Sequence, residues 1–192
     1  TIVLQTLDAG RWLPDGASPA DRAWTLSAAP AGSRRSVVLL AMVAALQAGR
    51  DAEVPDGLMQ AFAETLRDPQ ADPALAAEVL SLPTIGYLGD FLDSVDVDAL
   101  HSARETLRRT VGETLHDQLL ARYDDLRDMA PYRPTPAAIG RRSLKNRVLS
   151  FLVAAGGEAH CLDQYRAQHN MTDVMAALAL IADGEHPERE GV

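Results

Sequence analysis

The sequence predicts an all-α protein built from antiparallel helices stacked in pairs. Alanine and leucine dominate its apolar residues, and aromatic residues make up only 5% of the 192 positions. Alanine and leucine lose little side-chain freedom in a helix. Apolar residues recur at steps of three and four, which is the period of one helical face. Short connectors separate the segments and bring each helix back beside the one before it.

Residues that begin or end a helix set the predicted boundaries. Gly49 ends the first, almost wholly apolar segment because glycine tolerates the left-handed conformation. Asp72 and Pro73 are a strong start signal, since aspartate accepts from free N–H groups of the first turn and proline lacks one. Three prolines between 131 and 136 form a stiff connector. The predicted helices are residues 36–48, 55–67, 72–83, 84–93, 96–129, 136–155, 158–169 and 173–182.

The longest predicted helix, residues 96–129, carries one apolar stripe and a charged outer face. We expect Leu115, at the centre of the stripe, to be buried and Arg108 to lie on the outer side. The stripe consists of Leu100, Leu107, Val111, Leu115, Leu119, Tyr123 and Leu126.

Two regions differ in composition: an N-terminal segment of residues 1–35 and a helical region of residues 36–192. The first region holds both tryptophans, Trp12 and Trp24, together with several glycines and prolines. Residues 1–7 are β-branched and apolar, as in a short strand. We expect residues 1–35 to be irregular or β-like.

An apolar stretch behind Arg34 and Arg35 imitates an export signal. Residues 37–46 are apolar and Ala48 follows them, as at a cleavage site. We expect a buried helix instead, because the stretch lies inside the chain and runs directly into helical sequence. The alternative is a small exported protein cleaved near Ala48.

Composition argues against several classes of partner. The chain has 27 acidic and 18 basic residues, a formal net charge of −9, whereas phosphate binding needs clustered positive charge. No apolar run approaches the length that spans a bilayer. Cys161 is the single cysteine, which fits a reducing compartment. We expect no nucleic acid and no membrane as partner, and a cytoplasmic location.

Four sequence blocks stand out by their order and spacing. They are DPALAAEVLSLP at residues 72–83, a long run at 96–126, IGRRSLKNRVLSFLVAAG at 139–156 and QYRAQHNMTDVMAAL at 164–178. Within them, Arg142, Leu144 and Asn146 alternate along one segment, and Asn170 to Asp173 precede an alanine-rich helix. Together the blocks resemble the C-terminal helical domain of bacterial aminopeptidase N, the zinc alanyl aminopeptidases, over residues 36–192.

The resemblance implies a specific form and role. In that family the C-terminal domain is a curved α–α superhelix that closes over a separate catalytic domain, and a small β-domain precedes it. The resemblance thus implies a parent enzyme that removes N-terminal residues from peptides with zinc-activated water. This chain would wall the active-site chamber, with the catalytic domain of the same polypeptide as its partner and peptide substrates met indirectly.

The catalytic motifs of that family are missing from this sequence. A His-Glu-x-x-His motif presents two histidines one helical turn apart to a zinc ion, and no histidines here are paired in this way. The amine-binding motif Gly-x-Met-Glu-Asn is missing too. We therefore assign no catalytic, cofactor-binding or metal-binding residue, and expect zinc in the parent enzyme only. This chain alone is expected to be inactive. Its histidines are His101, His116, His160, His169 and His186.

A rival metal site would use His160, Cys161, Asp163 and His169, which are possible ligands within ten positions. Their spacing matches no zinc module, and neighbouring helical residues point about 100° apart. We expect ordinary structural roles instead. A nucleophilic role for Cys161 is no better supported, since a lone cysteine usually packs as a small apolar residue.

A basic run, Arg141, Arg142, Lys145 and Arg147, could contact phosphate, because Arg141 and Lys145 share a helical face. No aromatic residues are interleaved for base stacking. We expect these side chains to pair with carboxylates of neighbouring helices or of the catalytic domain.

The segment Asn170 to Asp173 is interpreted as a junction between two helices. We expect Thr172 to cap the following helix, Asp173 to lie in its first turn, and Met171 to fill the space between the helices.

Two functions are carried forward. The first is a part of the C-terminal domain of a zinc aminopeptidase. The alternative is a free-standing, non-catalytic helical-repeat binding module, for which the coding sequence upstream would contain no His-Glu-x-x-His motif.

Overall fold

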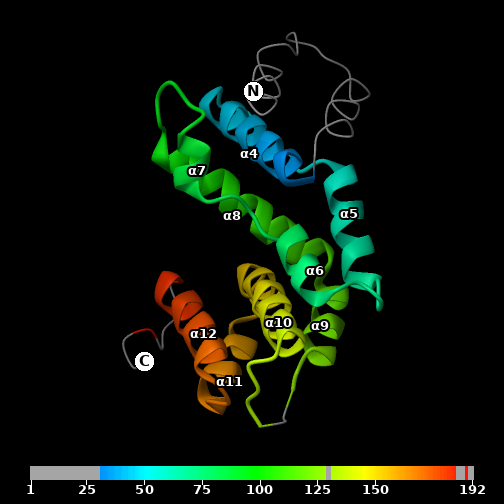
Figure 1. Ribbon diagram of the computed structural model, residues 1–192. Helices are drawn as coiled ribbons and strands as arrows, with labels where there is room; N and C mark the ends of the chain where they lie inside the picture. Colours follow the sequence, from blue (N-terminus) through cyan, green and yellow to red (C-terminus); the bar gives the residue numbers. More distant parts are fainter. Residues whose placement is uncertain (1–30, 129–130, 185–188, 190–192) are drawn as a thin grey trace. The chain divides into compact units, whose positions relative to one another are not determined.

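The computed structural model of the protein describes residues 31–128, 131–184 and 189. Within these residues all regular structure is helical and there is no strand, which confirms the all-α prediction (Figure 1). The strand predicted at residues 1–7 lies outside the described residues. No described helix is long and apolar enough to cross a lipid bilayer.

The chain divides into two compact units, which are described separately. Unit 1 is Thr1–Ala61 with Leu82–Leu107, and unit 2 is Phe62–Ser81 with Arg108–Val192. Helices α5 (Asp56–Arg67) and α8 (Val97–Thr114) each contribute one part to both units.

Unit 1 contains α4 (Ala31–Gln47) and α7 (Ile85–Gly89) beside its parts of α5 and α8. The apolar stretch of α4 packs as the sequence predicts, since Val38, Leu39, Met42 and Val43 are at most 2% exposed. The helix begins earlier than predicted, at Ala31. It ends before Gly49, whose φ of 68° is the left-handed conformation expected there.

Unit 2 is organised around α10 (Pro136–Ala154), which packs most extensively against α6 (Pro73–Val79), α9 (His116–Asp125), α11 (Glu158–Ala167) and α12 (Met171–Asp183). Asp72 caps α6 as predicted, accepting from the Leu75 N–H at 2.9 Å. The rings of Phe62 and Phe151 meet at 6.1 Å between centroids. The apolar side of α10 that fills the core of unit 2 comprises Leu144, Val148, Leu149, Phe151 and Leu152.

The predicted single helix over residues 96–129 is two helices, α8 and α9, separated at Leu115. Leu115 has φ −106° and ψ 18°, outside helical geometry. Hydrogen bonds nevertheless continue through it, from the Leu115 N–H to the Val111 carbonyl (3.0 Å) and from the Leu119 N–H to the Leu115 carbonyl (2.9 Å). Gly112 and Thr114 favour a helix weakly, which explains why the break falls here.

The apolar stripe is confirmed even though the helix is broken, because all seven of its residues are at most 6% exposed. The outer-face prediction for Arg108 is wrong. Its guanidinium donates to the Ser150 carbonyl of α10 at 3.1 Å, so this arginine joins two helices. Its neighbour Arg109 is exposed.

Gly112 lets α8 touch α10 at the backbone. A Cβ atom at this position would collide with the carbonyl oxygen of Phe151 and lie 2.8 Å from the Cβ of Ala155. Gly112 is itself buried. The close approach of α8 and α10 therefore depends on the lack of a side chain at Gly112.

Helix α10 ends in a glycine cap that reverses the chain. The Gly157 N–H donates to the Leu152 carbonyl (2.8 Å) and the Gly156 N–H to the Val153 carbonyl (3.1 Å). Gly156 has φ +89°, which favours glycine. A Cβ on Gly157 would lie 2.7 Å from the Leu152 oxygen. Both glycines are thus required by this short link to α11.

Gly112→Ala is expected to lower the free energy of unfolding by about 1–3 kcal/mol, since overpacking outweighs the ~1 kcal/mol that alanine gains in a helix. The matched control is Gly57→Ala in α5, where a Cβ meets nothing within 4 Å. This variant should be neutral or more stable by up to about 1 kcal/mol. Urea denaturation of the three proteins measures both effects, and a stabilised Gly112→Ala protein would contradict the close approach.

Leu115→Ala is expected to cost about 2–5 kcal/mol because it leaves a cavity on the buried stripe. Arg109→Ala, at an exposed position, should change stability by less than about 0.5 kcal/mol. Denaturant midpoints compare the two variants. Equal shifts would mean that the break at Leu115 frees its side chain from the core.

Candidate functional site

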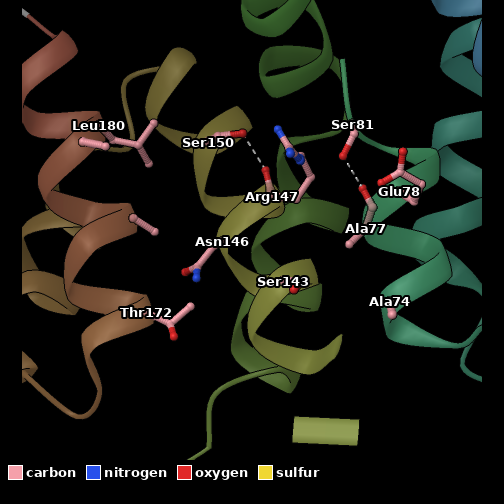
Figure 2. Close-up of a pocket in the computed structure, with 12 residues that line it drawn as sticks. Ala74, Ala77, Glu78, Ser81, Ser143, Asn146, Arg147, Ser150, Thr172 and Leu180 are labelled. Atoms are coloured by element: carbon pink, nitrogen blue, oxygen red, sulfur yellow. Dashed lines mark hydrogen bonds between the residues drawn. The ribbon is translucent and has the colours of Figure 1, made fainter. Parts of the chain in front are cut away.

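A trough runs over α10 between α6 and α12, and we call it the α10 trough. Its volume is about 510 Å³, within the range of small-molecule and peptide sites. Figure 2 shows α10 as its floor, with α6 and α12 on either side. The residues that line it are Ala74, Ala77, Glu78 and Ser81 of the α6 side, Ser143, Asn146, Arg147 and Ser150 of α10, and Thr172, Ala176, Ala179 and Leu180 of α12.

Small side chains give the trough its chemical character. Two serine hydroxyls are turned to carbonyls of their own segments: Ser81 donates to Ala77 (2.8 Å) and Ser150 to Arg147 (2.7 Å) (Figure 2). No histidine or cysteine lies among the lining residues to activate a hydroxyl. The arrangement therefore suits close contact with a helix or peptide backbone rather than catalysis.

Asp173 is the centre of a buried polar cluster beside the trough. One carboxylate oxygen accepts from Lys145 Nζ (2.5 Å) and Asn170 Nδ2 (2.8 Å). The other accepts from Asn146 Nδ2 (3.1 Å). Gln164 Nε2 donates to Asn146 Oδ1 (2.8 Å) and to the Asp173 carbonyl (3.0 Å). The cluster thus joins α10, α11 and the first turn of α12.

Tyr123 extends the polar cluster to α9, since its hydroxyl donates to Gln164 Oε1 at 3.1 Å. Lys145, Gln164 and Asp173 are 8%, 7% and 4% exposed. An intact buried ion pair adds little net stability, whereas removing one partner typically costs about 3–5 kcal/mol. The cluster therefore specifies which helices pair more than it stabilises the fold.

The junction before α12 differs from its predicted form. Asn170, not Thr172, caps the helix: its side-chain oxygen accepts from the Asp173 N–H at 3.0 Å. Thr172 lines the α10 trough instead. Met171 does not fill the junction, because it is 73% exposed. Asp173 lies in the first turn as predicted, but its carboxylate faces Lys145 rather than solvent.

The basic run takes part in local structure, as expected for Lys145, which pairs with Asp173. Arg141 donates to the Asp125 carbonyl at 2.6 Å. Arg142 lies over the Tyr132 ring, 4.8 Å from its centroid. Within the described residues, then, these cations do not form one phosphate-binding surface.

The rival metal ligands are not brought together. Cys161 donates to the Ala177 carbonyl at 3.3 Å, and the His160 ring lies 5.9 Å from that of Tyr123. Among residues 31–128, 131–184 and 189, no group of three or more His, Cys, Asp or Glu could hold a metal ion. The described residues therefore offer no ligand set for the zinc ion that the resemblance implies for the parent enzyme. We assign them no chemical step that involves zinc.

Burial raises the pKa of two groups, Cys161 of α11 and Tyr123 of α9. Burial, with a smaller effect of Glu158, raises the pKa of the Cys161 thiol from 9.0 to about 11. Burial likewise raises the pKa of Tyr123 from 10.0 to about 12. Both groups are therefore held in their neutral forms, and the Cys161 thiol is a poor nucleophile in the folded chain.

The polar cluster was not predicted from the sequence, although one signal was present. Lys145 follows Leu144 and stands three and four residues before Val148 and Leu149, on the buried side of α10. A cation on a buried stripe needs a partner. Its partner lies 28 positions away, and local periodicity does not indicate a contact at that distance.

The comparisons with known proteins are consistent for most of the chain. Residues 33–192 match a family described as a domain of unknown function (DUF3458_C) with ARM repeats. Aminopeptidase N of Escherichia coli K12 is 37% identical over 155 residues, 78% of this chain and 18% of that protein. Aminopeptidase N of Caulobacter vibrioides is 32% identical over 136 residues, 69% of this chain and 16% of that protein. The chain thus spans less than a fifth of these relatives.

A solved structure has the same fold. Legionella pneumophila aminopeptidase A, in complex with aspartic acid, matches with a TM-score of 0.63 over 97% of this chain and 23% of that one. Its sequence identity is 16%, so the likeness concerns the fold alone.

Stability is expected to fall as the pH rises from 9 towards 11, because the unfolded chain releases the Cys161 proton near 9.0 and the folded chain only near 11. Cys161→Ala should remove up to about 1.4 kcal/mol of this loss per pH unit. Urea denaturation at about pH 8 and about pH 10.5 measures how the free energy of unfolding changes with pH. A constant effect of the substitution on stability does not alter this slope. Equal slopes for the two proteins would contradict the raised pKa.

Proposed function

We propose that this chain, which belongs to the DUF3458_C family of ARM-repeat domains, is a non-catalytic wall of a zinc aminopeptidase. The chain corresponds to part of the C-terminal helical domain of aminopeptidase N. The observation that carries this proposal is the 37% identity to aminopeptidase N of Escherichia coli over 155 residues, 78% of this chain. The parent enzyme removes N-terminal residues from peptides with a zinc-activated water held by another domain.

The role proposed for the helices is to shape and restrict access. The catalytic domain of the same polypeptide is their partner, and peptides meet them while entering the chamber. The acidic charge of −9 supports a protein that takes no nucleic acid as partner. We further propose that the protein acts in the cytoplasm and without a membrane partner. The chain by itself is inactive.

The second candidate is a free-standing helical-repeat binding module. The α10 trough favours it, since a groove of small side chains over one helix can accept a peptide without any catalytic domain. The two candidates differ in what precedes this chain in the coding sequence. A His-Glu-x-x-His motif upstream in the same reading frame supports the enzyme, and a start codon directly before this region supports the module.

The proposed wall predicts a difference between the isolated chain and the enclosing polypeptide. The 192-residue chain should bind no stoichiometric zinc and should not hydrolyse an alanine anilide, whereas the longer polypeptide should do both. Metal analysis after gel filtration and a chromogenic assay measure this. One zinc per isolated chain, with turnover, would overturn the proposal.

Two substrates of different size distinguish an effect on substrate access from an effect on the chemical step in the enclosing polypeptide. Lys145→Met loosens α12 against α10 by removing a buried ion-pair partner. It should raise hydrolysis of a bulky alanine-headed protein relative to the anilide, since a looser wall admits larger substrates. Arg109→Ala, at an exposed position, is the matched control. An unchanged ratio in Lys145→Met would contradict the wall role while leaving membership in the enzyme intact.

A further inference from the structure

We propose that the hairpin formed by α11 and α12 (Glu158 to Asp183) is a detachable wall of the α10 trough, which undocks from α10 and unfolds while α9 and α10 remain folded. The polar cluster around Asp173 is the latch that holds the hairpin in place. This inference concerns the 192-residue chain itself and does not depend on the proposed enzyme.

The hairpin's docking contacts include a large polar share. Lys145 and Asn146 of α10 bind the Asp173 carboxylate, and Tyr123 of α9 and Asn146 bind Gln164. The buried apolar side chains of the hairpin are few: Cys161, Leu162, Ala177 and Ile181. Of these, Cys161 contacts the Ala177 carbonyl, inside the hairpin.

A polar latch makes undocking less costly than separating an apolar interface of equal area. When the hairpin leaves, water solvates Lys145 and Asp173 and recovers much of the hydration that burial removed. An apolar interface has no such compensation, because its cost grows with the area exposed. The hydrogen bonds share atoms of Asp173, Asn146 and Gln164. They therefore break together, and the latch has two states.

We expect the undocked hairpin to lose its helical structure. Helix α11 has 10 residues and α12 has 13, and isolated helices of this length are marginal in water. Undocking therefore exposes Cys161, which is 1% exposed in the folded chain.

The covalent link permits this motion. Gly156 and Gly157 connect α10 to α11, and a Cβ on Gly156 would meet nothing within 4 Å. Glycine adopts more backbone conformations than other residues, and hinges often contain such small residues. Undocking removes Thr172, Ala176, Ala179 and Leu180 from the trough. The trough consequently exists only when the latch is closed, so any occupant must favour the closed state.

Cys161, the single cysteine of the chain, reports undocking without any added label. The experiment measures its reaction with an excess of an aromatic disulfide at increasing urea concentrations below the unfolding transition. We expect labelling in water to be faster than global unfolding allows and to depend little on urea, because only the hairpin is exposed. Labelling that follows global unfolding at every urea concentration would overturn the proposal.

Two variants locate the opening. Lys145→Met should accelerate labelling in water by at least about tenfold, since it leaves Asp173 buried without its cation. Phe62→Leu disturbs the Phe62–Phe151 contact between α5 and α10, which stays formed in the open state. It should lower global stability and leave labelling in water unchanged. Acceleration by Phe62→Leu that matches its loss of stability would show global opening and sink the idea, as would an unaltered rate in Lys145→Met.

Hydrogen exchange followed by mass spectrometry gives an independent readout on the unmodified chain. Peptides from residues 158–183 should exchange together and before those from 136–154. Simultaneous exchange of both segments would contradict a detachable hairpin, whatever the behaviour of the variants.

Discussion

Unit 2 depends on the saturation of one buried carboxylate. The side chain of Asp173 accepts hydrogen bonds from Lys145, Asn146 and Asn170, and its backbone carbonyl accepts from Gln164. These contacts fix where α12 starts, how it turns from α11 and which side of α10 it covers. A charge in the core is acceptable only when every bond is made. The position of α12, and with it one wall of the α10 trough, is therefore set by directional bonds more than by apolar packing.

The sequence predicted features that are encoded by neighbouring residues. Gly49, Asp72 and Pro73 act on the turn beside them, so the end of α4 and the start of α6 followed from local chemistry. The stripe from Leu100 to Leu126 followed from periodicity and is buried. The prediction failed where a distant partner decides. Periodicity alone places Arg108 on the outer face, because its partner, the Ser150 carbonyl of α10, is 42 positions away in the sequence. Thr172 and Asn170 are both able to cap a helix, and only the register of α12 selects Asn170.

The function was inferred from a different kind of observation than the fold was. Periodicity and capping predict helices for any chain of this composition. Among the described residues no group of three or more His, Cys, Asp or Glu could hold a metal ion, and the α10 trough is lined by no histidine or cysteine. The order of four sequence blocks pointed to aminopeptidase N, and the family match agrees with it. The proposed wall role requires shape and spacing rather than reactive groups, so few individual residues indicate it. The trough and the polar cluster are accordingly the features through which this chain can be tested by itself.

The short link after α10 has a consequence for how copies of the chain behave together. Gly156 and Gly157 are too few to let a released hairpin explore much space around its own helix. When the turn straightens, α11 is carried away from α10, and the vacated polar surface matches the hairpin of any identical molecule. Short connections of this kind are typical of proteins that exchange elements between subunits. An exchange of hairpins between two copies would make every bond of the closed hairpin again, between two molecules instead of within one.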